Sequence, residues 1–249
     1  ETVEFADVVL PAAGFAEKDG TFTNTERRVQ RVRAAVDPPG QARTDWQITC
    51  ELARRMGCEM SYEHVSEIQD EIASLTPIYG GITYGRLEEG ALQWPCPDAE
   101  HPGTPYLHAG RFTRGRGKFH PVEFIPPREL PDDEFPLLLS TGRILEHFHT
   151  GTMSRRADVL DKLVPAGVIE VHPADAERLG VADGEKVRVI SRRGQIEIAA
   201  RVTERVAAGS LFLAFHYREA PANRLTIAAL DPIAKIPELK VCAVRIEKL

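Results

Sequence analysis

The sequence lacks the patterns that mark several common functional classes. No apolar run approaches the roughly 20 residues that a membrane-spanning helix requires, and it contains neither a G-x-G-x-x-G motif nor a Walker loop. The four cysteines form no C-x-x-C pair, and their spacing matches no zinc or iron–sulfur pattern. They indicate scattered thiols in a reducing compartment, which favours the cytoplasm and leaves a periplasmic location open.

Positive charge is also in deficit. The formal net charge of -6 argues against nucleic acid as the main partner, because proteins that bind it usually present a basic face. A hydrophobic content of 43% and a charged content of 27% are ordinary for globular proteins, so a core of useful size is expected. A local basic pocket for an anionic ligand remains compatible with this balance.

Residues 1–58 are expected to form part of an α/β domain. Residues 6–10 are a short apolar run, which predicts a strand. Residues 44–56 carry apolar side chains at helical spacing, which predicts a helix capped by Thr44 or Asp45.

Residues 59–134 are rich in glycine and proline, so irregular structure and hairpins are expected there, with one helix over residues 66–75. A basic cluster lies in this segment: Arg111, Arg114, Arg116 and Lys118. It predicts either a solvated hairpin tip or a loop that faces an anion or another subunit.

Residues 135–249 are predicted to be mainly β. Short apolar or alternating runs separated by turns predict strands over 135–139, 168–171, 186–190, 195–202, 210–215 and 240–246, with a helix over 173–179. Several short strands of this kind are typical of a barrel or a sandwich.

The most informative segment follows the first of these strands. It runs through Gly142 and Arg143 to two histidines one residue apart, His147 and His149. Glycine lets a ligand approach the backbone, and the planar arginine fork matches phosphate oxygens. Three interpretations follow: a site for a phosphorylated cofactor, a metal site that uses the two histidines, or a structural strand end with a helix cap.

Separated motifs in this sequence resemble one known family. The segments Ala6-Asp-Val-Val-Leu-Pro-Ala-Ala13, Thr141-Gly-Arg-Ile-Leu-Glu-His-Phe-His-Thr150 and Asp231-Pro-Ile-Ala-Lys235 are similar, in this order, to motifs of the dimethyl sulfoxide reductase superfamily of molybdopterin oxidoreductases. Within that superfamily, Leu92-Gln-Trp-Pro-Cys-Pro97 and Phe112-Thr-Arg-Gly-Arg-Gly-Lys118 most resemble formate dehydrogenase alpha subunits.

The resemblance implies a cofactor site without a catalytic residue or a metal ligand in this chain. The residues that match positions contacting a molybdopterin guanine dinucleotide are Lys18, Asp45, Thr141, Gly142, Arg143, Ile144, Leu145, Glu146, His147, Phe148, His149, Thr150, Asn223 and Lys240. Phe215 matches a position near the substrate channel of nitrate reductases. The structural alternatives are a surface charge, a helix cap, a turn, a solvated strand end and, for Phe215, the core.

The resemblance also implies a mixed α/β, then mainly β fold. Residues 1–58 are the C-terminal part of a Rossmann-like α/β domain, residues 59–134 are an irregular connecting segment, and residues 135–249 are a double-psi β-barrel that binds the dinucleotide. The implied cofactor is a bis-molybdopterin guanine dinucleotide with molybdenum or tungsten.

The resemblance further implies an oxidoreductase whose other parts lie outside this sequence. The family's cluster cysteines and its metal-ligating cysteine or selenocysteine are missing, so the chain is expected to be a fragment that does not oxidise formate by itself. The expected partners are the remainder of the catalytic subunit, with its [4Fe-4S] cluster, and electron-transfer subunits. Two rivals stay open: a segment of a nitrate reductase, and a stand-alone barrel that binds a partner subunit.

Overall fold

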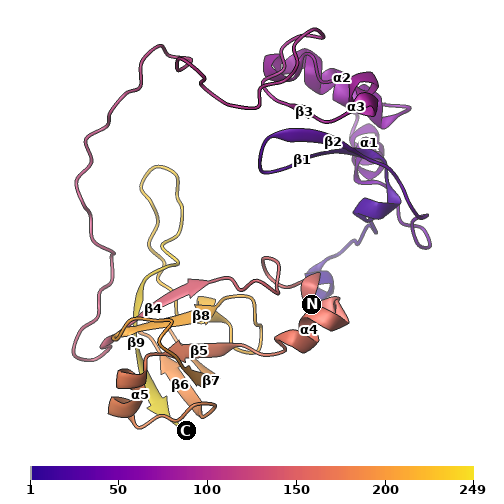
Figure 1. Cartoon of the computed structure of the whole chain (residues 1–249). Helices are drawn as coiled ribbons and strands as arrows, with labels where there is room; N and C mark the ends of the chain where they lie inside the picture. Colours follow the sequence, from indigo (N-terminus) through magenta and orange to yellow (C-terminus); the bar gives the residue numbers. More distant parts are fainter. Residues whose placement is uncertain (1) are drawn as a thin grey trace. The chain divides into compact units, whose positions relative to one another are not determined.

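The computed structural model describes residues 2–249 of the chain (Figure 1). The chain divides into two compact units, Glu1–His120 and Pro121–Leu249. Each unit has its own sheet and its own buried core. No helix within the described residues is long and apolar enough to cross a bilayer.

A small antiparallel sheet organises the first unit. Its strands, in spatial order, are β1 (Gly20–Thr23), β2 (Arg28–Val32) and β3 (Leu92–Gln93). Asn24 forms the β1–β2 turn, because its side-chain oxygen accepts hydrogen bonds from the backbone N–H groups of Glu26 and Arg28. The helical elements of this unit are η1 (Thr2–Phe5), η2 (Phe15–Glu17), α1 (Asp45–Arg55), α2 (Val65–Leu75), η3 (Pro77–Tyr79) and α3 (Tyr84–Glu89).

Both helices predicted in this unit are confirmed. Thr44 is the N-cap of α1, and Gly57 follows the last turn with a φ of 84°. The ring of His64 caps α2 by accepting a hydrogen bond from the Ser66 N–H. The buried core that these elements surround is small, and consists of Val29, Ile82, Leu87 and Cys96.

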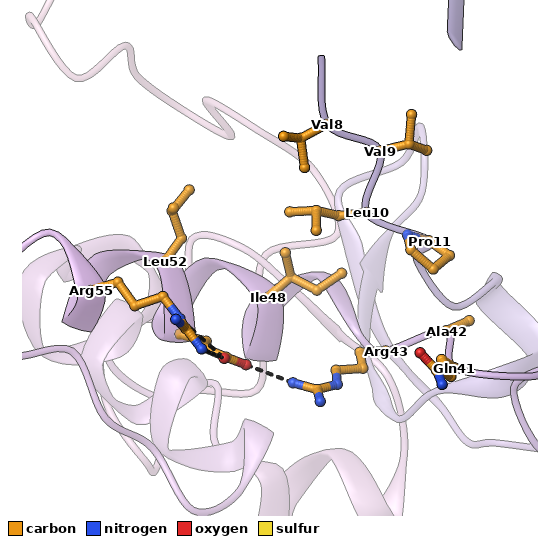
Figure 2. A pocket seen from close by; sticks show the side chains of 11 residues that line it. Val8, Val9, Leu10, Pro11, Gln41, Ala42, Arg43, Ile48, Leu52 and Arg55 are labelled. Atoms are coloured by element: carbon orange, nitrogen blue, oxygen red, sulfur yellow. Dashed lines mark hydrogen bonds and ion pairs between the residues drawn. The ribbon is translucent and has the colours of Figure 1, made fainter. Parts of the chain in front are cut away.

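The strand predicted over residues 6–10 is wrong. This run pairs with no strand in the described part of the chain, and its Val8 and Leu10 side chains are 73% and 57% exposed. An apolar run forms a strand only where neighbouring strands satisfy its backbone and cover its side chains. The run instead lines an open pocket of about 940 Å³ together with Ile48 and Leu52 of α1 (Figure 2).

The segment expected to be irregular contains more structure than predicted. The helix α3 and the strand β3 were not predicted, whereas residues 105–136 contain neither a helix nor a strand. The four basic side chains are exposed beside a turn that the isolated bridge between Phe112 and Gly115 closes.

The second unit is a closed six-stranded β-barrel with the strand order β4-β8-β5-β7-β6-β9 (Figure 1). Neighbouring strands are antiparallel except for two parallel pairs, β4 with β8 and β5 with β7. The strands are β4 (Leu137–Gly142), β5 (Val168–Val171), β6 (Lys186–Ile190), β7 (Gln195–Val202), β8 (Ser210–Ala214) and β9 (Cys242–Lys248). The helical elements are η4 (Ser154–Arg156), α4 (Asp158–Leu163), α5 (Pro173–Leu179) and η5 (Ala222–Arg224).

The sequence predicted this unit closely. Strands β5, β6 and β7 and the helix α5 have the predicted bounds. Strand β4 begins at Leu137 and not at Phe135, because the Asp132 side chain accepts a hydrogen bond from the Phe135 N–H at 2.9 Å and holds that residue in a turn. The helix α4 was not predicted, and β9 begins two residues later than expected.

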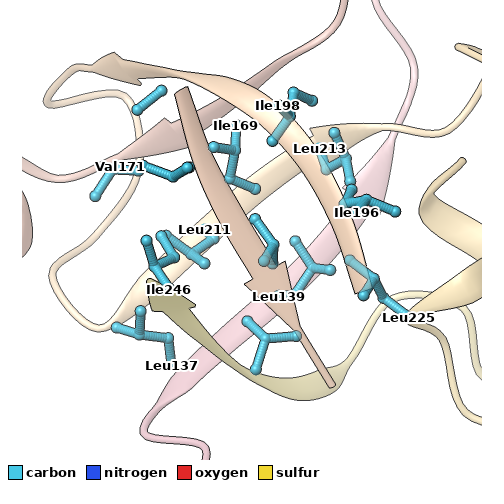
Figure 3. Packing of buried hydrophobic residues seen from close by; sticks show 14 of the residues in the cluster. Leu137, Leu139, Ile169, Val171, Ile196, Ile198, Leu211, Leu213, Leu225 and Ile246 are labelled. Carbon is cyan, nitrogen blue, oxygen red and sulfur yellow. The ribbon is translucent and has the colours of Figure 1, made fainter. Parts of the chain in front are cut away.

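The barrel is filled by side chains from all six strands (Figure 3). In four of the strands, side chains that are less than 2% exposed occupy alternate positions: Leu137 and Leu139 in β4, Ile169 and Val171 in β5, Val187 and Val189 in β6, and Leu211 and Leu213 in β8. Burying one such side chain stabilises a protein by about 1.5–3 kcal/mol. This continuous core fixes the ends of β4 and β8. The polar residues of the candidate site follow these two ends.

A buried carboxylate joins the segment before β4 to the barrel. Glu129 accepts hydrogen bonds from the guanidinium groups of Arg192 and Arg193 and from the Ala243 N–H at 2.7–3.0 Å. Burial by itself would raise the pKa of Glu129, but these hydrogen bonds outweigh it and lower the pKa to about 2. Glu129 is therefore ionised at neutral pH.

Candidate functional site

The carboxyl ends of β4 and β8 lie side by side at one end of the barrel. These strands are parallel, with Gly142 opposite Ala214. A Cβ on Gly142 would lie 2.4 Å from the Phe212 ring, so a larger residue does not fit there without a shift of that ring. The Gly142 carbonyl accepts a hydrogen bond from the Phe215 N–H at 3.1 Å. The two segments that leave the strands therefore start next to each other, an arrangement that forms ligand sites in parallel sheets.

A pocket of about 650 Å³ opens where these segments meet. It is lined by Thr141, Arg143, His149, Thr150, Phe215, His216, Tyr217, Arg218, Pro221, Asn223, Leu239 and Lys240. In the described part of the chain, its lining includes cationic side chains and no carboxylate. Its size suits a small-molecule ligand, and its charge attracts anions although the chain as a whole is acidic.

Two hydrogen bonds fix the side of the pocket that precedes β9. The Thr141 hydroxyl donates to the Leu239 carbonyl at 2.6 Å, and the Lys240 ammonium donates to the Thr141 carbonyl at 2.6 Å. Because an ammonium group has three donors, Lys240 keeps donors for a ligand while its position is fixed.

The loop after β4 is held by a buried histidine. His147 is 3% exposed, and its Nε2 lies 3.0 Å from the Val164 carbonyl oxygen, so Nε2 donates. Its Nδ1 then accepts from the Ser154 hydroxyl at 3.2 Å. Since both nitrogens are engaged, His147 supports the loop and is not available to a metal. Within residues 2–249 no group of three or more His, Cys, Asp or Glu side chains could hold a metal ion.

Arg155 ties the same loop to the segment after β8. Its guanidinium donates to Glu219 at 2.9 Å and to Asp161 at 3.3 Å, and lies 5.2 Å from the centre of the Tyr217 ring. Gly151 makes room for this arginine with a φ of 74°, because a Cβ there would lie 3.0 Å from Arg155 Cγ. The back of the pocket is therefore a packed and hydrogen-bonded wall.

His216 belongs to this wall but makes none of its hydrogen bonds. The residue is 6% exposed, and neither ring nitrogen has a hydrogen-bond partner among the described residues. Burial, followed by the effects of His147 and Arg155, lowers the pKa of His216 to about 4, so the ring is neutral at pH 7. A neutral imidazole offers one donor and one acceptor.

The structure brings together about half of the residues that the resemblance implied. Those that line the pocket are Thr141, Arg143, His149, Thr150, Phe215, Asn223 and Lys240. Ile144, Leu145 and Glu146 line a second cavity of about 440 Å³, which shares Arg143 and Tyr217 with the pocket. Three others from this loop line neither the pocket nor the second cavity: Gly142 and His147 are buried, and Phe148 is exposed.

Two further implied residues belong to the first unit. Lys18 and Asp45 form an ion pair there, with side-chain exposures of 24% and 63%. The hydrogen bond from Lys18 lowers the pKa of Asp45. The pair therefore positions two charged groups at the start of α1.

Sequence reasoning found that the segment Phe215-His-Tyr-Arg-Glu-Ala220 resembles formate dehydrogenases but assigned no site role to His216, Tyr217 or Arg218. The signal that could have identified them is the parallel pairing of β4 with β8, which places the residues after both strands in one site. That pairing joins segments about seventy residues apart, and the local pattern of neither strand reveals it.

Family comparisons identify the class to which this site belongs. Residues 137–243 match the molydopterin dinucleotide binding domain, and residues 1–55 match the molybdopterin oxidoreductase family. The chain therefore resembles molybdopterin oxidoreductases in both parts, and its barrel matches a domain that binds a molybdopterin dinucleotide.

Individual relatives narrow this class. The chain is 52% identical over its whole length to the F420-dependent formate dehydrogenase 2 subunit alpha of Methanococcus maripaludis, and 52% identical to the F420-dependent formate dehydrogenase subunit alpha of Methanocaldococcus jannaschii. It spans 37% and 38% of the lengths of these relatives. Acetylene hydratase from Pelobacter acetylenicus shares the fold, with a TM-score of 0.73 at 18% identity over the whole chain and 39% of that structure.

The pocket fits the phosphorylated part of such a cofactor. Arg143 and Lys240 supply cationic donors, Thr150 supplies a hydroxyl, and Asn223 supplies an amide that can both donate and accept. The unpaired nitrogens of His216 add hydrogen-bonding capacity that the protein itself does not use. The donor set therefore suits a ligand with several phosphate oxygens and a polar nucleobase.

Proposed function

We propose that this chain orients a bis-molybdopterin guanine dinucleotide, with molybdenum or tungsten, as part of a formate dehydrogenase catalytic subunit. The enzyme oxidises formate to carbon dioxide and passes two electrons to iron–sulfur clusters in the rest of the assembly. The names of the relatives support this activity, and the cationic pocket at the ends of β4 and β8 supports the cofactor role. When bound, the cofactor supplies the redox chemistry, while the protein supplies orientation and electrostatics.

The pocket is the observation that carries the proposal. Arg143 donates to phosphate oxygens, and its guanidinium is held 5.8 Å from the centre of the Phe215 ring. Lys240, fixed by the Thr141 carbonyl, contributes a second positive charge. Thr150 and Asn223 provide neutral hydrogen bonds that distinguish a nucleotide from a simple anion.

The remaining parts of the proposal concern architecture and assembly. The two parallel strand pairs within the closed barrel support a double-psi topology for residues 135–249. The match of residues 1–55 supports a remnant of a Rossmann-like domain, to which Lys18 and Asp45 contribute further cofactor contacts. The proposed partners are the rest of the catalytic subunit and electron-transfer subunits, in the cytoplasm.

Replacement of Arg143 tests the pocket. In holoenzyme that carries this chain, Arg143→Ala removes charge-assisted hydrogen bonds worth about 1.5–3 kcal/mol, so cofactor content per subunit should fall, while activity per bound cofactor falls less. Cofactor content is measured by mass spectrometry and metal analysis. Arg188→Ala is the control, since Arg188 pairs with Glu197 on the barrel and does not line the pocket. Full cofactor loading in Arg143→Ala would show that the assignment is wrong.

A paired assay tests the substrate. The holoenzyme should reduce a dye with formate and should show no nitrate reduction above background with reduced viologen. Both substrates are small planar anions that a cationic site attracts, so charge alone does not select between them. Nitrate turnover without formate turnover would move the chain to the nitrate reductases and leave the cofactor pocket in place.

A further inference from the structure

His216 is a buried polar side chain of the pocket wall that makes no side-chain hydrogen bond within the described residues. Its ring is buried, and both nitrogens are shielded by protein atoms without a partner among the described residues. Buried polar groups nearly always have a hydrogen-bond partner, so two ring nitrogens without one in a ligand pocket need an explanation.

The polar side chains around the His216 ring make hydrogen bonds to other groups. The His147 ring, 4.8 Å away between centroids, uses its nitrogens on Ser154 and Val164. The Tyr217 ring, 4.0 Å away, donates its hydroxyl to the Val164 carbonyl at 2.9 Å. Arg155 is engaged by Glu219 and Asp161. Each of these neighbouring side chains is therefore held by hydrogen bonds to groups other than His216.

The ring is also confined on the side of the loop. A Cβ on Gly151 would lie 3.5 Å from His216 Cδ2, so the loop backbone packs directly against the ring. His216 also lines the pocket, beside Phe215 and Tyr217. The cations of the same pocket concentrate anionic ligands there.

We propose that His216 donates a hydrogen bond to a phosphate oxygen of the bound dinucleotide, after a turn of its ring about the side-chain bonds. The inference rests on the proposed cofactor role and adds a binding residue to it. Because the low pKa keeps the ring neutral, His216 binds through a directional N–H and not through charge. In this proposal the ring of His216 has no hydrogen-bond partner within the protein, and the bound dinucleotide supplies the acceptor.

The test compares two histidines that lie in one cluster. His216→Phe keeps a ring of similar shape and removes the unpaired nitrogens, whereas His147→Phe breaks the hydrogen bonds to Ser154 and Val164. Binding of GDP and of inorganic pyrophosphate to the cofactor-free catalytic subunit that carries this chain is measured by calorimetry, and Tm is measured without ligand. His216→Phe should retain or raise Tm and weaken binding of both probes at least tenfold. His147→Phe should lower Tm.

Each alternative result has a separate meaning. If His216→Phe lowers Tm and leaves both dissociation constants unchanged, His216 is a packing residue and the inference fails while the pocket assignment stands. A loss of affinity for GDP alone would place the contact on the base and overturn the phosphate assignment. If the unchanged subunit binds neither probe at millimolar concentration, the pocket assignment fails and the inference fails with it.

Discussion

The two compact units differ in the size of their buried hydrophobic cores. The barrel closes on itself, and its core contains residues from every strand. The first unit has a four-residue buried core and leaves Val8, Val9 and Leu10 exposed beside α1 (Figure 2). The pocket with a packed wall therefore lies in the unit that has the larger core, and the smaller core of the first unit is accompanied by exposed apolar side chains of the kind found at interaction sites.

The sequence allows the two units to be followed separately. Both tryptophans, Trp46 and Trp94, belong to the first unit, so tryptophan fluorescence reports on that unit. Hydrogen exchange of peptides from residues 137–249 reports on the barrel. A perturbation of one core should therefore appear in one signal and not in the other.

The largest expected effect is the loss of a central barrel side chain. Leu213→Ala should lower the free energy of unfolding of the barrel by about 2–5 kcal/mol, because Leu213 is fully buried and its removal leaves a cavity. Barrel peptides should exchange faster, while the tryptophan transition moves little. Ile82→Ala, in the core of the first unit, is the matched control and should give the reverse pattern. Equal shifts of both signals in either variant would show that the units unfold as one.

The buried carboxylate of Glu129 should give the barrel a pH dependence. Its pKa is lowered to about 2, so the ion pairs with Arg192 and Arg193 contribute stability above the ordinary pKa of 4.5, and this stability is lost as the pH falls toward 2. A shift of this size corresponds to a contribution on the order of 3 kcal/mol. Glu129→Gln should lower stability at pH 7 and flatten its decline between pH 5 and pH 2.

Urea unfolding followed by circular dichroism at several pH values measures this dependence. Glu134→Gln is the control, because Glu134 is 71% exposed and lies 3.7 Å from its partner Arg245, so the control should change stability by less than about 1 kcal/mol. An unchanged pH profile in Glu129→Gln would show that the cluster does not stabilise the barrel.

The same contrast explains what could be predicted from the sequence. Strands such as Lys186–Ile190 and Gln195–Val202 were predicted because alternation of polar and apolar residues is imposed by a barrel whose other strands all lie within this chain. The run at residues 6–10 has the same apolar character and forms no strand, because a strand also requires a neighbour. A local sequence pattern shows that a segment favours a strand. The strand forms only where a neighbouring strand pairs with it, as in the closed barrel.

The residues of the candidate site were likewise predictable only where a local motif identified them. Arg143, His149 and Thr150 were identified through the family resemblance, and the pocket contains them, although their proposed contacts remain a prediction. His147 and His149 are indistinguishable by spacing, yet one is buried and hydrogen-bonded within the loop and the other lines the pocket. His216 was not identified because it reaches the site through the parallel pairing of two distant strands.

The smallest expected effect on stability concerns the ion pair of the first unit. Lys18→Ala should lower the free energy of unfolding by less than about 1 kcal/mol, because Asp45 is 63% exposed and the pair is screened by solvent. If Lys18 contacts the cofactor, the same substitution should nevertheless reduce cofactor content in the holoenzyme. A small effect on folding with a larger effect on loading would show that the first unit, like the barrel, holds the cofactor.

Arg55→Ala provides the matched comparison for Lys18→Ala. Arg55 forms an exposed ion pair with Glu51 on the same helix, so its removal should alter stability by a similar small amount. It is not among the residues implied to contact the cofactor, so loading should stay unchanged. Tryptophan fluorescence gives the two stabilities, and mass spectrometry of the holoenzyme gives the two loadings. Equal loading in both variants would confine the cofactor contacts of this chain to the barrel, because Lys18 would then act only as the partner of Asp45.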